Sequence, residues 1–292
     1  PTSLARREEL TAYLFLAPNL IGFLLFTVLA TLASLGISFT NWDLLTPPQW
    51  AGVHNYVKLW QDPTFWKVLK NTLFFTVTSV PLTVALGLVL ALGLNRKMRG
   101  TAWLRSAYFV PVVTSSFVIA LVWRWLYNPD YGMMNYLLRL IGITGPNWLT
   151  SQKWAMTAVV IVSVWKGCGY AMVLFLAGLQ SISDQIYEAG SIDGTNSWQR
   201  FRYLTIPLLT PTTFFVSIIS LIGSFQVFDS VSALTDGGPA DATRPLVMYI
   251  VDNAFTYLSM GYGAALAWVL FAIVFVITLV QWRLQRHWVH YE

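Results

Sequence analysis

Two ionisable residues lie inside long apolar stretches of the sequence, where a charge is costly. Lys166 is about ten residues into one such stretch, which at about 1.5 Å per helical residue is near the middle of a bilayer. Asp229 lies in the following stretch, close to Gln226. Ionisable groups buried in a membrane are often part of a transport path. The three side chains could therefore line a polar cavity and hydrogen-bond a solute. The alternative is that Lys166 pairs with Asp229, or with backbone carbonyls, and only holds helices together; the residues alone leave both readings open.

Other reactive residue types offer little for catalysis. We find no nucleophile–base set in the sequence, and the histidines (His54, His287 and His290) lie in loops or in the tail without a partner set for zinc. The single cysteine, Cys168, cannot form an intrachain disulfide. The sequence therefore predicts that the chain is not an enzyme and holds no metal.

The composition is that of an integral membrane protein, with 56% apolar and only 11% charged residues. Six segments are long and apolar enough to cross a bilayer as helices, and they lack the alternation of a barrel strand. They run approximately over residues 13–39, 71–94, 104–127, 156–179, 212–231 and 261–282. The first is too long for a signal peptide and lacks a cleavage site. We expect an all-α membrane protein with one transmembrane domain over residues 1–292.

The basic residues favour an orientation with both termini in the cytoplasm, although the excess on that side is small. The short loop 95–105 is dense with positive charge: Arg96, Lys97, Arg99 and Arg105. Arg6 and Arg7 precede the first segment, and Arg283 and Arg286 follow the last. Topology thus explains the basic pI without nucleic acid as a partner.

The longest cytoplasmic excursion, residues 180–211, predicts two short helices joined by a tight turn. Ser181 followed by Asp184 is a plausible start for the first helix, which has an apolar face. Asp193 and Gly194 supply the turn. Ser197 could cap the second helix, 198–204, and Pro207 would stop it. This geometry favours a docking element over a plain loop.

The same stretch contains a spaced motif. Glu188-Ala189-Gly190 is followed at a fixed offset by Gly194 and then by Leu204-Thr205-Ile206-Pro207. It resembles the EAA signature of membrane-spanning subunits in binding-protein-dependent ABC importers, which reads Glu-Ala-Ala, three residues, Gly, nine residues, Ile-x-Leu-Pro. The third Ala is Gly190 here and the final aliphatics are exchanged, but the spacing is intact.

The resemblance extends over nearly the whole chain and points to the carbohydrate-uptake branch of type I ABC importer permeases. The segments that carry it are Trp165-Lys166-Gly167, residues 177–180, residues 225–229, Gly237-Gly238-Pro239 and Gly261-Tyr262. Within that branch, which includes the maltose and glycerol-3-phosphate systems, the chain looks like the first of two non-identical permeases. The resemblance implies six transmembrane helices with coupling helices between the fourth and fifth spans, in a bacterial or archaeal inner membrane.

The resemblance also implies partners. They are a second permease subunit, two ATPase subunits, an extracytoplasmic solute-binding protein and a carbohydrate substrate, in contact with membrane lipid. The sequence has no Gly-x-x-x-x-Gly-Lys-Ser/Thr phosphate loop, so ATP and Mg would be bound by the ATPase and this chain would hold no cofactor. The residues expected to couple it to the ATPase are Glu188, Ala189, Gly190, Asp193, Gly194, Leu204 and Pro207.

The residues expected to contact a sugar lie in the fourth and fifth segments. They are Ser163, Lys166, Gly167, Tyr170, Ser224, Phe225, Gln226 and Asp229. Rings could stack on a sugar face while hydroxyl and amide groups bond its edges. Aromatic residues in a membrane helix are more often packing, and only the resemblance favours Tyr170 and Ser224. Residues 237–244 and the Trp-rich first loop are the surface expected to face the binding protein.

Two functions from other classes remain to be weighed. An ion-coupled secondary transporter could use Lys166 and Asp229 as a relay, but it would not need the 188–207 element, and inverted repeats are not evident. A membrane-embedded enzyme lacks a visible catalytic set.

Overall fold

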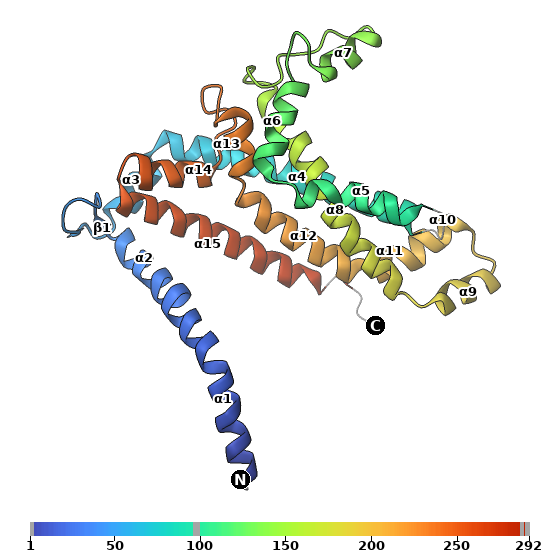
Figure 1. Ribbon diagram of the computed structural model, residues 1–292, viewed down its shortest axis with the longest axis horizontal. Coiled ribbons are helices and arrows are strands. Elements are labelled where there is room, and N and C mark those ends of the chain that lie inside the picture. Colours follow the sequence, from blue (N-terminus) through green and yellow to red (C-terminus); the bar gives the residue numbers. More distant parts are fainter. Residues whose placement is uncertain (1–2, 96–99, 287–288, 290–292) are drawn as a thin grey trace. The chain divides into compact units, whose positions relative to one another are not determined.

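The computed structural model describes residues 3–95, 100–286 and 289, and it is mostly helical (Figure 1). Arg96, Lys97, Arg99, His287 and His290, which entered the charge and metal predictions, lie outside the described residues, as do the side chains of Arg6 and Arg7. The contacts group the chain into two units. One comprises residues 1–62 with 250–271, and the other residues 63–249 with 272–292.

Four helices in the described part are long and apolar enough to cross a membrane: Thr11–Ser38, Pro63–Leu94 (α4), Ala155–Ser181 (α8) and Met260–Gln285 (α15). Two bent pairs raise this to six if each pair is one span. The first joins α5 (Thr101–Val113) to α6 (Ser116–Leu126) at 100°. The second joins Ser197–Leu208 to α12 (Thr210–Phe225) at 61°.

Two of the expected segments are therefore not single helices. The segment 104–127 breaks at Thr114 and Ser115, whose ψ angles of 140° and 132° are extended and turn the chain between α5 and α6. The segment 212–231 ends as α12 at Phe225 and resumes as α13 (Asp229–Thr235). Both breaks lie where the chain borders the cavity described below.

The first unit begins with one long helical stretch: α1 (Ser3–Phe23), the π-helical turn η1 (Leu24–Leu29) and α2 (Ala30–Ser38). β1 (Thr40–Asn41) then pairs antiparallel with β2 (Gln49–Trp50), with Thr40 opposite Trp50. Helix α3 (His54–Gln61) follows; it ends before Asp62, and α4 begins at Pro63. η3 (Asp252–Thr256) and the first part of α15 complete the unit.

A polar cluster holds the first unit together. The Asn55 amide, in a side chain only 5% exposed, donates to the Ser38 and Thr40 carbonyls at 2.9 Å each. A Cβ at Gly261 would lie 1.8 Å from the Thr40 carbonyl oxygen, so only glycine fits there. This close approach of the two backbones explains why residue 261 is glycine. The next residue, Tyr262, donates a hydrogen bond from its hydroxyl to the Asp62 carboxylate at 2.7 Å.

The second unit is built on α4 and α8, which pack against each other along their lengths. A Cβ at Gly87 would lie 2.5 Å from the Ala171 Cβ, so glycine lets the two helices approach closely. α5, α6, α12, α13 and the short helix α7 (Met133–Leu140) complete most of this unit. α14 (Leu246–Val251) follows the loop 236–245.

The loop before α14 is fixed by hydrogen bonds from α4. The Lys67 ammonium donates to the Ala240 carbonyl at 2.7 Å, and the Asn71 amide donates to the Asp241 and Arg244 carbonyls at 2.7 and 3.0 Å. An ion pair of 3.1 Å joins Arg244 to Asp241. The loop is therefore a rigid surface.

Candidate functional site

Most of the predicted solute-contacting residues line one cavity of the second unit, with a volume of about 370 Å³. Helices α4, α5, α6, α8, α12 and α13 contribute to its wall. Of the eight predicted residues it includes seven: Ser163, Lys166, Gly167, Tyr170, Ser224, Gln226 and Asp229. Phe225 is the exception. Its ring is 1% exposed and packs in the interior, because it is one helical position beyond Ser224 and points away from the cavity.

Lys166 is held by a hydroxyl and not by a carboxylate. Its Nζ donates to Ser116 Oγ, at the first residue of α6 just after the bend. Within the described residues, no ion pair joins Lys166 to Asp229. The proposed structural pairing of these two residues is therefore absent. The cavity wall instead carries a positive and a negative group that are both still available to a polar solute.

The two serines of the cavity differ in their partners. Ser163 Oγ is buried, and no hydrogen-bond partner for it occurs in the described part of the chain. An orphaned buried hydroxyl is costly, so a bound solute that bonds it would be favoured. Ser224 Oγ is instead bonded to Thr76 Oγ1 at 2.9 Å and to the Leu221 carbonyl at 2.7 Å. Ser224 therefore fastens α12 to α4.

Sequence reasoning missed the contribution of α4 to this wall. Ser79 and Thr83 line the cavity, and Thr76 bonds Ser224. Thr72 accepts a hydrogen bond from the Leu246 backbone amide at 2.9 Å. Residues 72, 76, 79 and 83 are spaced by four, three and four, which places their hydroxyls on one helical face. That stripe within an apolar span was the signal that could have identified them.

The segment between α8 and α12 forms the predicted hairpin of short helices, but the helices begin and end at other residues than predicted. The first helix, α9 (Asp184–Ile192), is capped by Ser183 and not by Ser181, whose hydroxyl bonds the Gly178 carbonyl at 2.8 Å within α8. The second, α10 (Ser197–Arg200), is capped by Asn196, not by Ser197. Asn196 and Gln199 form a reciprocal capping box at 2.9 and 2.8 Å.

Pro207 does not stop the second helix. The chain continues through the π-helical turn η2 (Phe201–Thr205) into α11 (Ile206–Leu208), so Pro207 lies inside α11. Proline is tolerated there because it stands near the start of a helical segment, where its missing N–H removes little. The helical path instead changes direction at Leu209, before α12.

The two arms of the hairpin brace each other. Gly194 has a φ of +74° in the turn, a conformation that favours glycine. Gly190 is buried, and a Cβ there would lie 2.9 Å from a Leu204 methyl group. The Arg200 guanidinium donates to Ser191 Oγ at 3.1 Å. The two arms of the hairpin are therefore packed and hydrogen-bonded to each other.

The outer surface of this hairpin is unusually apolar for a solvated loop. Ile192 is 86% exposed, Trp198 68% and Tyr203 71%. Glu188, Ala189, Asp193 and Gly194 are also exposed, while Leu204 and Pro207 are half-buried. Exposed aromatic residues of this kind are typical anchors of a protein interface. Ile192, Trp198 and Tyr203 were not among the predicted coupling residues.

Two sequence relatives and one solved structure are similar to this chain. The chain is 38% identical to "Probable ABC transporter permease protein YesP" of Bacillus subtilis (strain 168), over 98% of this chain and 94% of that protein. It is 37% identical to "Lactose transport system permease protein LacF" of Rhizobium radiobacter, over 98% and 97%. A chain of a bacterial alginate ABC transporter, solved in complex with an alginate pentasaccharide-bound periplasmic protein, shares the fold with a TM-score of 0.84. That match has 23% identity and covers 96% of this chain and 95% of the other.

A family model described as "Binding-protein-dependent transport system inner membrane component" matches residues 83–289. That range contains the hairpin, α8 and most of the cavity wall. The chain therefore belongs to the family of inner membrane components of binding-protein-dependent transport systems.

Proposed function

We propose that this chain is a translocation subunit of an ATP-driven ABC importer that moves a carbohydrate into the cell. The observation that carries the proposal is the joint presence, in one chain of this family, of a polar cavity between apolar helices and an exposed rigid hairpin. The names of the relatives that transport sugars support carbohydrate as the substrate class. An ion-coupled transporter has no comparable support, because the family depends on a binding protein.

The cavity supplies the contacts that a sugar requires. Lys166, Gln226 and Asp229 can donate to or accept from hydroxyl groups, and Ser163 has an orphaned hydroxyl among them. The rings of Tyr170 and Phe228 are also in the wall and can stack on the apolar face of a sugar. No catalytic step is needed, since the solute crosses unchanged.

The hairpin is the coupling element in this proposal. Its exposed apolar side chains would dock on an ATPase subunit, which binds ATP and Mg, with a second permease completing the pore. Because α9 and α10 are braced as one body, closure of the ATPase dimer would move them together and rock the helices around the cavity. The energy comes from tighter ATP binding to one of the two states, since a ligand shifts an equilibrium only by that difference. We place the assembly in the inner membrane, with the hairpin and both termini in the cytoplasm.

Reconstitution tests the proposal directly. Proteoliposomes that contain the chain, its second permease and its ATPase are given the solute-binding protein and radiolabelled lactose, maltose, trehalose or maltotriose. We expect uptake of at least one sugar with ATP inside, and none when ATP, the ATPase or the binding protein is omitted. Uptake driven by an imposed proton or sodium gradient without ATP would contradict the proposal, and so would the absence of uptake for all four sugars.

A further inference from the structure

A second hollow, with a volume of about 560 Å³, lies farther along the same helices and belongs to none of the predicted sites. Its wall is formed by the end of α6, the segments 128–131 and 147–150, and α13 with Asp236. Helix α6 reaches both hollows, with Ser116 at the first and Arg124 at the second. Helix α13 does the same, with Asp229 at the first. The two hollows therefore share two wall helices.

The separation of the hollows fits a short chain of sugars. Arg124 is eight residues beyond Ser116 on α6, or about 12 Å along the helix axis. The second hollow also lies at the Ala155 end of α8, while the hairpin follows the other end at Ser181. Helix α8 has 27 residues. If the hairpin is cytoplasmic, the second hollow lies on the external side of the first, and this step depends on the function proposed above.

The floor of the second hollow is aromatic, with its polar atoms already bonded. Tyr127 and Trp148 pack with ring centroids 5.3 Å apart. The Tyr127 hydroxyl donates to the Ala158 carbonyl at 3.1 Å, and the Trp148 indole donates to Asn135 at 2.7 Å. Tyr127 is 1% and Trp148 8% exposed, so these two residues form a rigid buried floor, and the ring surface open to a sugar comes from the mouth of the hollow.

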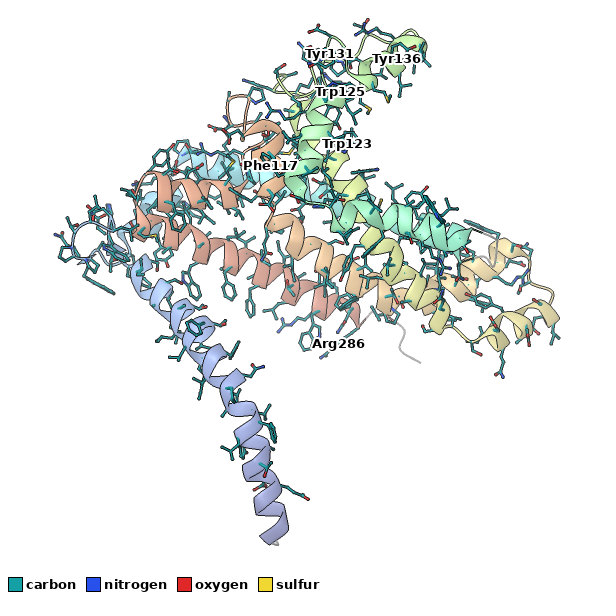
Figure 2. The ribbon with its side chains drawn as sticks, viewed as in Figure 1. Phe117, Trp123, Trp125, Tyr131, Tyr136 and Arg286 are labelled. Carbon is teal, nitrogen blue, oxygen red and sulfur yellow. The ribbon has the colours of Figure 1, made fainter. Side chains whose placement is uncertain are left out.

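The mouth of the hollow is also aromatic. Trp125 and Tyr131 are 57% and 64% exposed, with ring centroids 6.4 Å apart, and Figure 2 shows them near each other at the end of α6. A smaller hollow of about 210 Å³ lies on these same two rings. Because both hollows share the Trp125–Tyr131 pair, the rings form a platform with open space beside each of them.

The rim carries hydrogen-bonding groups without partners. In the described part of the chain, the side chains of Arg124, Asn147 and Asp236 have no hydrogen bond or ion pair, although all three line the hollow. They combine donors and acceptors above aromatic rings, which is the pattern that recognises sugar hydroxyls. A wall for lipid tails would be apolar throughout. Arg124, next to the exposed Trp125, is thereby placed at a polar rim.

We propose that this hollow is an outer saccharide-binding subsite, which receives a sugar ring before that ring reaches the Lys166 cavity. Trp125 supplies the stacking surface, and Arg124, Asn147 and Asp236 bond the hydroxyl groups. An oligosaccharide could occupy both hollows at once. The outer subsite would then hold the trailing rings while the leading ring enters the inner cavity.

The test measures sugar affinity on the assembled transporter. The permease pair and ATPase are placed in phosphatidylcholine nanodiscs without binding protein, and lactose, maltose, trehalose and maltotriose are titrated by saturation-transfer-difference NMR. We expect Trp125→Ala to weaken the affinity for the bound sugar by about 3- to 10-fold, the loss expected for one ring contact. Trp125→Phe should retain most of the affinity. Asn147→Ala, an exposed loop position, provides a second variant if Trp125→Ala fails to assemble.

Trp103→Ala is the matched control, because Trp103 is 80% exposed and lines neither hollow; its affinity should be unchanged. Equal sugar affinity in wild type, Trp125→Ala and Asn147→Ala would overturn the proposal. So would weaker association with the binding protein at unchanged sugar affinity, which would make this a protein-docking face. A dependence on lipid headgroup in place of sugar would assign the hollow to lipid. If uptake itself fails for all four sugars, the proposed function fails first; if uptake is normal but the variants bind equally, only the subsite is refuted.

Discussion

The turn of the hairpin offers a perturbation that acts through the backbone alone. Gly194 has a φ of +74°, and no heavy atom lies within 4 Å of a Cβ added there. Alanine should therefore add no clash and only the strain of the left-handed conformation, about 1–2 kcal/mol. This shifts the population of the observed turn by about 5- to 30-fold. Proline fixes φ near −65° and removes the N–H that donates to the Ser191 carbonyl at 3.2 Å, so this turn should be lost.

A matched glycine lies outside the hairpin, in the segment between α7 and α8. Gly142, after α7, has a φ of +78°, also has no heavy atom within 4 Å of an added Cβ, and donates to the Arg139 carbonyl at 3.0 Å. Gly142→Ala and Gly142→Pro therefore introduce nearly the same backbone strain at a position outside the hairpin. A difference between the two positions must come from what the hairpin does.

The assay is recovery of the ATPase with tagged permease, followed by sugar uptake per ATP hydrolysed. We expect partial loss of ATPase recovery for Gly194→Ala and nearly complete loss for Gly194→Pro. Gly142→Ala and Gly142→Pro should recover the ATPase normally. Normal recruitment and uptake in Gly194→Pro would refute the coupling role of the hairpin. Equal loss of recruitment in Gly142→Pro would show that the effect is general misfolding.

Three further predictions concern packing, the cavity and the docking surface. A Cβ at Gly169 would lie 2.1 Å from the Tyr108 carbonyl oxygen, so Gly169→Ala should lower the free energy of unfolding by about 1–3 kcal/mol. Gly93→Ala is the control, because no heavy atom lies within 4 Å of a Cβ added there, and it should leave the free energy of unfolding unchanged. Thermal unfolding in detergent compares the two variants. Lys166→Met should reduce initial uptake by about tenfold or more, while the ATPase still co-purifies. Trp198→Ala should weaken ATPase binding by about 30-fold in a pull-down titration, as for an interface anchor.

The sequence predicted the cavity better than the path of its helices. Lys166, Gln226 and Asp229 were identifiable because polar groups are rare in apolar spans, and the resemblance added their neighbours. Pro111 marks the end of α5 as a place for a kink, but the break itself is at Thr114 and Ser115, and its size of 100° could not be read from the sequence. Whether a broken helix is stable there depends on tertiary contacts, including the bond from Lys166 to Ser116.

For the hairpin, too, the sequence predicted which elements form but not where they begin or which side chains are exposed. Two helices and a turn at Gly194 followed from spacing. The caps were assigned to Ser181 and Ser197, but Ser183 and Asn196 hold these positions. Serine and asparagine are similarly good cap residues, so type alone could not choose between neighbours one or two positions apart. Exposure of Ile192, Trp198 and Tyr203 likewise required the folded structure, because apolar residues in a sequence are first expected to be buried.

The central claim, that the hairpin meets a cytoplasmic ATPase, is tested most directly by cysteine accessibility. Cys168 is buried, so a single introduced thiol reports on its own position. Ile192→Cys marks the hairpin, and Asp130→Cys marks the exposed turn between α6 and α7. We predict that a membrane-impermeant maleimide labels Ile192→Cys only in inverted vesicles, that the ATPase protects it, and that Asp130→Cys reacts only on intact spheroplasts. Labelling of Ile192→Cys from outside intact spheroplasts would contradict the account.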